Sequence, residues 1–219
     1  MPAATPEPFT DDAISAPGTT TRTLLIACGA LAREIRLVLG QLPPALAKLY
    51  DVEYLPANLH NRPERIPARV EELIVANKER YGRIAVAYAD CGTGGLLDAV
   101  LDRHGVTRLP GAHCYEFFAG AEAFAQLHES ELGTFFLTDY LCKHFEPLVM
   151  GALGIERHPE LRDMYFGNYV RVVLLSQSDD PTLVEAGRSA ARRLGLAFEH
   201  RHVGMQPFAE SVNLLLGVS

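Results

Sequence analysis

The sequence "RIAVAYADCGTGGLLDAVL", residues 83–101, carries the strongest structural signal in this chain. The apolar run over 83–89 is typical of a buried strand, and it stops just before a cysteine that is followed by three glycines within four residues. An amphipathic stretch over 95–105 then predicts a short helix. A strand, a Gly-rich turn and a helix in immediate succession indicate a parallel α/β unit.

The same alternation continues along the chain on both sides of this unit. It predicts an α/β fold, a mostly parallel sheet with helices on both faces, which is a Rossmann-like arrangement. The stretches 22–57 and 169–203 share one layout, so two pseudo-repeated lobes are an option within this fold. The predicted strands cover 22–28, 50–57, 83–89, 106–112, 133–138, 170–176 and 197–203, and the predicted helices 30–42, 62–82, 95–105, 115–129, 139–154 and 181–194.

The domain organisation predicted from composition is simple. Residues 1–20 are rich in Pro, Ala and Thr and lack the basic and apolar regions of a signal peptide, so they are predicted to be a disordered N-terminal tail. No linker rich in Pro, Gly or Ser interrupts the remainder. Residues 21–219 are therefore predicted to form a single α/β domain.

Charge and hydropathy narrow the classes of function. The net charge is −7, and no run of Lys or Arg is present, which argues against a nucleic-acid groove or a polybasic membrane anchor. No apolar stretch reaches the roughly 18 residues that a membrane-spanning helix needs. We expect a cytoplasmic protein, in which structural disulfides are rare, so the four cysteines are left for packing, metal binding or catalysis.

Three of the cysteines, Cys28, Cys91 and Cys114, follow the ends of predicted strands, and His60 follows another. Parallel strands deliver their carboxyl ends to the same edge of a sheet, where ligands bind. Three thiolates and an imidazole suit zinc or another thiophilic ion, so the four residues form a candidate metal site. The alternative is that the cysteines only pack in the core. Cys142, in the middle of a predicted helix, is expected to be such a core residue.

Other residues near these strand ends are candidates for supporting roles. His113, adjacent to Cys114, is a candidate acid/base or ligand-orienting group, and its ring is an alternative to His60 as the fourth ligand. Glu34 is a candidate to orient a ligand or accept a proton, with a solvated helix carboxylate as the alternative. Gly92 and Gly94 are candidate cofactor-binding positions, because they keep the turn tight and expose amides at a helix N-terminus, which would favour a thiolate at Cys91.

The Gly-rich turn does not match a nucleotide-binding fingerprint. "GTGGLLD" lacks the third glycine of a dinucleotide-binding motif, and no phosphate-binding lysine follows it. Dinucleotide binding is therefore not expected.

Five segments occur in an order that resembles a known family: "CGALAREI", "LHNRPERIPARVEELI", "VAYADCGTGGLLDAVL", "GAHCYEFFAG" and "GTFFLTDYL". The family is the uncharacterised domain of unknown function 1638, and the resemblance covers most of residues 22–205. The family pattern falls here on Cys28, His60, Cys91, Gly133, and His113 with Cys114. The chain departs from it at "HC", where many relatives have His-Asp-Cys, and at "DYL", where they often carry Gly-Trp.

The resemblance implies a link to corrinoid-dependent methyl metabolism, because relatives are often encoded beside corrinoid proteins and methyltransferases. It also points to such a protein as a partner, through which a corrinoid would act as cofactor. We therefore weigh an enzyme with transferase-type chemistry, whose bound ion activates a small thiol or amine, against a non-catalytic metal or corrinoid carrier or chaperone. A third hypothesis is an enzyme with a cysteine nucleophile activated by His113. The identity of the metal and the oligomeric state stay open.

Overall fold

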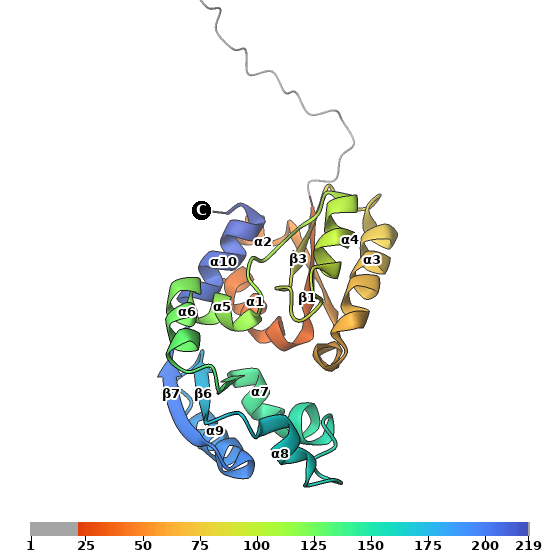
Figure 1. Ribbon diagram of the computed structural model, residues 1–219. Helices are drawn as coiled ribbons and strands as arrows, with labels where there is room; N and C mark the ends of the chain where they lie inside the picture. Colours follow the sequence, from red (N-terminus) through yellow and green to blue (C-terminus); the bar gives the residue numbers. More distant parts are fainter. Residues whose placement is uncertain (1–21, 219) are drawn as a thin grey trace, which may run out of the picture.

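Residues 22–218 are described by a computed structural model, in which the chain forms two separate sheets with all strands parallel (Figure 1). The predicted parallel α/β fold is confirmed. The predicted tail, residues 1–20, lies outside the described residues. The first sheet has the strand order β2-β1-β3-β4, formed by β1 (Thr23–Cys28), β2 (Tyr50–Leu55), β3 (Arg83–Ala87) and β4 (Thr107–Arg108). The second sheet has the strand order β5-β6-β7, formed by β5 (Thr134–Thr138), β6 (Arg171–Ser176) and β7 (Ala197–His202).

The centre of the first sheet is β1, which pairs with β2 along its whole length, from Thr23 opposite Tyr50 to Cys28 opposite Leu55. It also pairs with β3 on its other side. The interior of β1 is buried on both faces, because helices cover the sheet above and below. This explains why the strand reads as a continuous apolar run in the sequence rather than an alternating one.

Two groups of helices cover the first sheet. One face packs against α3 (Ile66–Asn77) and α4 (Leu96–His104), and the other against α1 (Ala32–Gly40), α5 (Cys114–Ala119) and α10 (Gln206–Leu216). The connections also contain α2 (Pro44–Ala47) and the 3-10 helices η1 (Gly29–Leu31), η2 (Ala57–Asn61) and η3 (Pro63–Arg65).

The second sheet is covered in the same way. Phe124 of α6 (Ala121–Ser130) packs on one face with Phe136, Val173 and Leu175 of the strands. The other face packs against α7 (Asp139–Lys143), the π-helix η4 (Glu146–Gly151), α8 (Leu161–Phe166) and α9 (Pro181–Leu194). The two stretches with a similar predicted layout each form a parallel β-α-β unit, β1-α1-β2 and β6-α9-β7.

Three predicted elements differ from those observed. The helix predicted over 115–129 is broken by Gly120, whose φ of 83° ends α5 and separates it from α6. The helix predicted over 139–154 divides into α7 and η4, and the strand predicted over 106–112 keeps only the two residues of β4.

The C-terminal helix α10 was not predicted, although Phe208, Val212 and Leu216 give it a buried apolar face. It returns from the second sheet to the first and contacts α1 and α5 (Figure 1). The Arg83 guanidinium donates hydrogen bonds to the carbonyls of Leu215 and Leu216, which fixes the end of the helix beside β3. Among residues 22–218, none of the helices has the length and apolar character needed to cross a membrane.

Candidate functional site

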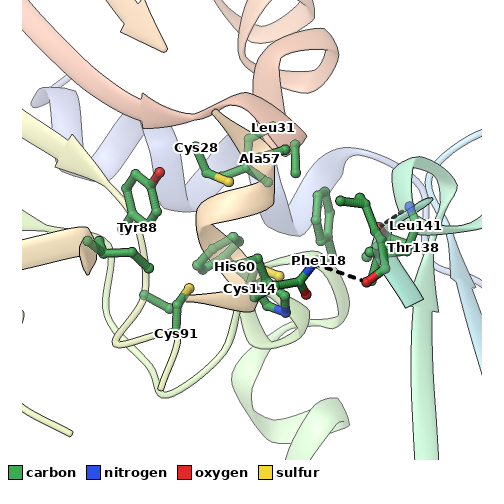
Figure 2. A pocket seen from close by; sticks show the side chains of 16 residues that line it. Cys28, Leu31, Ala57, His60, Tyr88, Cys91, Cys114, Phe118, Thr138 and Leu141 are labelled. Atoms are coloured by element: carbon green, nitrogen blue, oxygen red, sulfur yellow. Dashed lines mark hydrogen bonds between the residues drawn. The ribbon is translucent and has the colours of Figure 1, made fainter. Parts of the chain in front are cut away.

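A small cavity lies between the carboxyl ends of the two sheets, and Figure 2 shows the side chains that line it. Its volume is about 40 Å³, roughly three times the space that one buried water molecule requires. The segments that follow β1, β2 and β3 form most of its wall, and Thr138, Leu141 and Leu148 close it from the side of the second sheet. The Asn61 side-chain amide joins the two sides by donating to the Leu148 carbonyl at 3.2 Å.

All four residues of the candidate metal site line this cavity. Cys28 ends β1, Cys91 lies in the turn after β3, and Cys114 begins α5. His60 lies on η2, and its ring faces the same space as the thiols (Figure 2). Within residues 22–218, however, no three His, Cys, Asp or Glu side chains are grouped closely enough to hold a metal ion in their present orientation.

The backbone at Cys91 is strained. Its φ is 51°, and no other non-glycine residue in the described part of the chain has a positive φ. The left-handed conformation costs a residue with a Cβ roughly 1–2 kcal/mol. Two hydrogen bonds hold the turn against the segment before Cys114, from the Cys91 amide to the Ala112 carbonyl (2.9 Å) and from the Asp90 amide to the Gly111 carbonyl (3.1 Å). Strain of this kind is concentrated at functional sites.

The Asp90 side chain organises the Gly-rich turn. Its carboxylate accepts hydrogen bonds from the Thr93 hydroxyl (2.7 Å) and from the amides of Gly94 (3.0 Å) and Gly95 (2.8 Å). Burial raises the pKa of Asp90, but these hydrogen bonds together hold it below its usual value. The amides that were expected to favour a thiolate at Cys91 therefore bind Asp90 instead.

The two glycines proposed to bind a cofactor do not line the cavity. Gly92, with a φ of 83°, lies against the ring of Pro63, and the Gly94 amide is already bonded to Asp90. Both residues shape the turn that carries Cys91. Their role toward a cofactor stays a prediction.

The three thiols are neutral when no cation is near them. Burial raises the pKa of Cys28 and of Cys114, and it raises the pKa of Cys91 to about 12, with the neighbouring Cys28 as the next contribution. The expectation that the turn lowers the pKa of Cys91 is wrong for the protein alone, because desolvation exceeds the effect of the nearby backbone amides. A bound cation is the change that would make thiolates stable here.

The two histidines lie at the outer side of the cavity. Desolvation lowers the pKa of His60, and the neighbouring His113 lowers it further, so the His60 ring is neutral at pH 7 and has a free lone pair. His113 is exposed and precedes the first residue of α5. Its amide and that of Ala112 donate to the Glu116 carboxylate, but its ring is not part of the cavity wall.

Glu34 lies on α1, outside the cavity wall, and only 3% of its side chain is exposed. The alternative of a solvated helix carboxylate is therefore wrong. Its carboxylate lies 3.0 Å from the Arg33 guanidinium, which is also 3.7 Å from the buried carboxylate of Asp139 on α7. Asp139 in turn accepts hydrogen bonds from the Gln177 amide and the Ser178 hydroxyl. Arg33 thus pairs with buried carboxylates on two helices, α1 and α7, that cover different sheets.

Sequence reasoning missed Tyr88, the aromatic residue in the apolar run that contains β3. Tyr88 is 2% exposed and lines the cavity, and its hydroxyl lies beside the Cys28 thiol. A tyrosine at the end of a buried strand was the available signal, because a buried hydroxyl needs a partner. Phe117 and Phe118 of α5 also line the cavity. Cys142 is buried in the core of the second sheet, as predicted.

Comparisons with known proteins give one match. A family described as "Protein of unknown function (DUF1638)" matches residues 54–212, well over half of the chain. This range includes His60, Cys91 and Cys114 of the cavity. Comparison with curated proteins and with solved structures gave no match. The chain therefore belongs to the DUF1638 family of proteins of unknown function.

Proposed function

We propose that this protein binds a thiophilic metal ion, zinc or a similar ion, through Cys28, Cys91 and Cys114, with His60 as the fourth donor. The observation that supports the proposal is that these four side chains, from four separate segments, line one small cavity. Thiolate and imidazole are the donors that tetrahedral zinc sites use. The rest of the wall is almost entirely apolar, so it offers the four donors little competition.

Binding would require two changes in these side chains. The thiols would have to turn toward a common point, because they are not grouped for an ion in their present orientation. They would also have to lose their protons, which burial opposes, because it raises the pKa of all three thiols. The ion would supply the free energy for this step, so its affinity would rise with pH. Neutral His60 needs no deprotonation.

We further propose that the site is catalytic and acts on a small thiol or amine in corrinoid-linked methyl metabolism. This chemistry needs an open fourth position, so His60 would here handle protons and leave that position to the substrate. An ion held by the three cysteines would supply Lewis-acid activation of the substrate's donor atom. Phe118 and Leu141 would exclude water from the cavity. His113, which is exposed and lies beside His60 rather than on the cavity wall, would pass the substrate's proton on to solvent. A corrinoid protein or methyltransferase would be the partner.

A carrier or chaperone for a metal or corrinoid is the second candidate. The observation that favours it is that His60, which lines the cavity, belongs to an exposed segment, so an ion bound there could exchange. The third hypothesis, a cysteine nucleophile activated by His113, has less support. The thiols have raised pKa values, and His113 does not share the cavity wall with them.

The proposal is tested by measuring metal per chain in protein purified without a metal-binding tag. We expect one thiophilic ion per chain, and a chain that stays metal-free after growth and refolding with zinc would contradict metal binding. The rate of ion loss to an added chelator separates the two candidates. A catalytic site should lose its ion slowly and retain it during turnover, whereas a carrier should exchange it rapidly with a second chelating protein.

A further inference from the structure

A second pocket lies directly beside the cavity that the cysteines line, which we call the thiol cavity. The two spaces share four wall residues: His60 and Asn61 of η2, Leu141 of α7 and Leu148 of η4. The second space, which we call the outer pocket, has a volume of about 220 Å³ and is partly open to solvent. Because the wall is shared, a ligand in one space contacts residues that also line the other.

The remaining wall of the outer pocket is almost entirely apolar. It consists of Tyr115 of α5, Phe135 of β5, and Val149 and Leu153 from η4 and the turn after it. In the described part of the chain, no Asp, Glu, Lys or Arg side chain lines this pocket. Sites for small ligands are typically of this kind, largely apolar with a few polar groups.

The volumes set the size of the groups that fit. An engineered apolar cavity of about 150 Å³ in another protein binds benzene, so the outer pocket can hold a phenyl ring or an alkyl chain of similar size. The thiol cavity, with about 40 Å³, can take only a few heavy atoms. A charged group would have no counter-charge in the outer pocket and would have to lie outside it.

The backbone of the shared wall supports a binding role. Residues Glu146–Gly151 of η4 form a π-helix, a rare conformation that occurs frequently at functional sites. This helix places Leu148 on the wall of both spaces and Val149 on the wall of the outer pocket. The strained residue Cys91 lies on the wall of the adjoining thiol cavity. Uncommon backbone conformations therefore border both spaces.

We propose that the outer pocket binds an apolar alkyl or aryl group of the same small ligand whose head group enters the thiol cavity. This inference rests on the proposed function only in treating the thiol cavity as a ligand site, and it adds the class of group that the ligand carries. The Asn61 side chain, which donates to the Leu148 carbonyl on the shared wall, is exposed. Water can therefore replace this hydrogen bond when a ligand extends from one space into the other.

The experiment uses NMR spectroscopy of the metal-free protein with labelled methyl groups. Toluene is the probe for the outer pocket alone, and 2-phenylethanethiol adds a thiol head group to the same ring. Leu153→Phe places a ring in the outer pocket. Leu214→Phe is the matched control, because Leu214 is 80% exposed on α10 and lines neither space. Sedimentation with and without toluene reports whether the chain self-associates.

We expect toluene to shift the methyl resonances of Leu148 and Leu153 and to leave those of Val75, an exposed residue outside both spaces, unchanged. Leu153→Phe should weaken toluene binding by at least about tenfold, because its ring occupies the apolar space that toluene would fill. Leu214→Phe should bind toluene as the wild type does.

The second probe tests whether one ligand spans both spaces. The ring of bound 2-phenylethanethiol should give nuclear Overhauser contacts to Leu153. The methylene group beside its sulfur should give contacts to Leu31, which lines only the thiol cavity.

Three results would overturn the inference. If toluene shifts Val75 as much as Leu153, or binds Leu153→Phe as tightly as the wild type, the outer pocket is not its site. If the thiol end gives no contact to Leu31, the two spaces do not hold one ligand. If the wild type is a dimer that toluene dissociates, the pocket is an interface between copies.

The wild-type shifts and contacts decide the question even if Leu153→Phe does not fold. All of these measurements use metal-free protein, so they are separate from the test of the proposed metal site. A chain that binds no zinc but binds both probes as described would remove the metal site and leave this inference standing.

Discussion

Replacing Cys91 by glycine and by alanine would measure the strain in the turn that carries it. In most positions, a glycine variant is less stable than the alanine variant by about 0.5–1 kcal/mol, because the unfolded chain gains freedom. Cys91 has a φ of 51°, and alanine would keep the cost of that conformation, roughly 1–2 kcal/mol. Glycine would relieve it.

The strain that glycine relieves, roughly 1–2 kcal/mol, is larger than the stability it loses through the freer unfolded chain, about 0.5–1 kcal/mol. The Cys91→Gly protein should be more stable than the Cys91→Ala protein by about 0.5–1 kcal/mol, the reverse of the usual order. Both variants lose the thiol, so the loss of its packing against the residues around β1 and β3 largely cancels in the comparison.

The assay is urea unfolding of the metal-free proteins, with the midpoint converted to a free energy at a common slope. Neither variant should retain the proposed metal site. If Cys91→Ala is as stable as Cys91→Gly or more stable, the turn relaxes without strain, and the argument that the fold keeps a strained cysteine for a function is refuted.

Three further predictions concern the same edge of the first sheet. Metal affinity should rise by up to about tenfold per pH unit for each thiol that loses a proton on binding, because the pKa values of all three thiols are raised. An affinity that is the same at about pH 6 and about pH 8 would contradict thiolate ligation. Gly29→Ala should lower the free energy of unfolding by about 1–3 kcal/mol in urea titrations, because its Cβ would lie 2.9 Å from the Leu55 carbonyl oxygen. Gly40→Ala, with open space around it, is the control and should not be destabilising. Asp90→Ala should have a lower free energy of unfolding than the wild type at pH 7. The difference in free energy should shrink as the pH falls through the lowered pKa of Asp90, because the carboxylate stabilises the turn only when it is ionised. A difference that does not change with pH would refute this.

The strands were predictable because their burial leaves a clear record in the sequence. The runs over 22–28, 83–89 and 170–176 each have a continuous apolar centre, as expected for strands covered on both faces, and each contains an observed strand. Two lobes were predicted only as an option, because the division into two sheets depends on which strands pair, and strand pairing leaves no local pattern. The break at Gly120 and the helix α10 did carry local signals, a glycine within an apolar run and Phe208, Val212 and Leu216 at helical spacing, but neither was recognised.

The site was predictable where topology alone fixes it. Cys28, Cys91 and Cys114 were placed on one sheet edge because each follows the end of a predicted parallel strand, and they line one cavity. The direction of the pKa shift of Cys91 was predicted wrongly, because the burial of the thiol, which raises its pKa, depends on the three-dimensional packing around the turn. The burial of Glu34 was also missed, since it arises from packing between α1 and the second sheet rather than from the pattern of the helix itself.

The proposed metal site is best tested by titrating Co²⁺ into the wild type, Cys91→Ser and Cys142→Ser and recording the thiolate-to-metal charge-transfer absorption. Cys91 lines the cavity, whereas Cys142 is buried in the core of the second sheet. Tetrahedral thiolate sites accept Co²⁺ in place of zinc, so the band reports bonds between sulfur and the ion. The wild type and Cys142→Ser should each saturate at one ion per chain with the same band, and Cys91→Ser should lose most of it while remaining folded. Equal bands in Cys91→Ser and the wild type, or no band in any of the three, would contradict the three-thiol site.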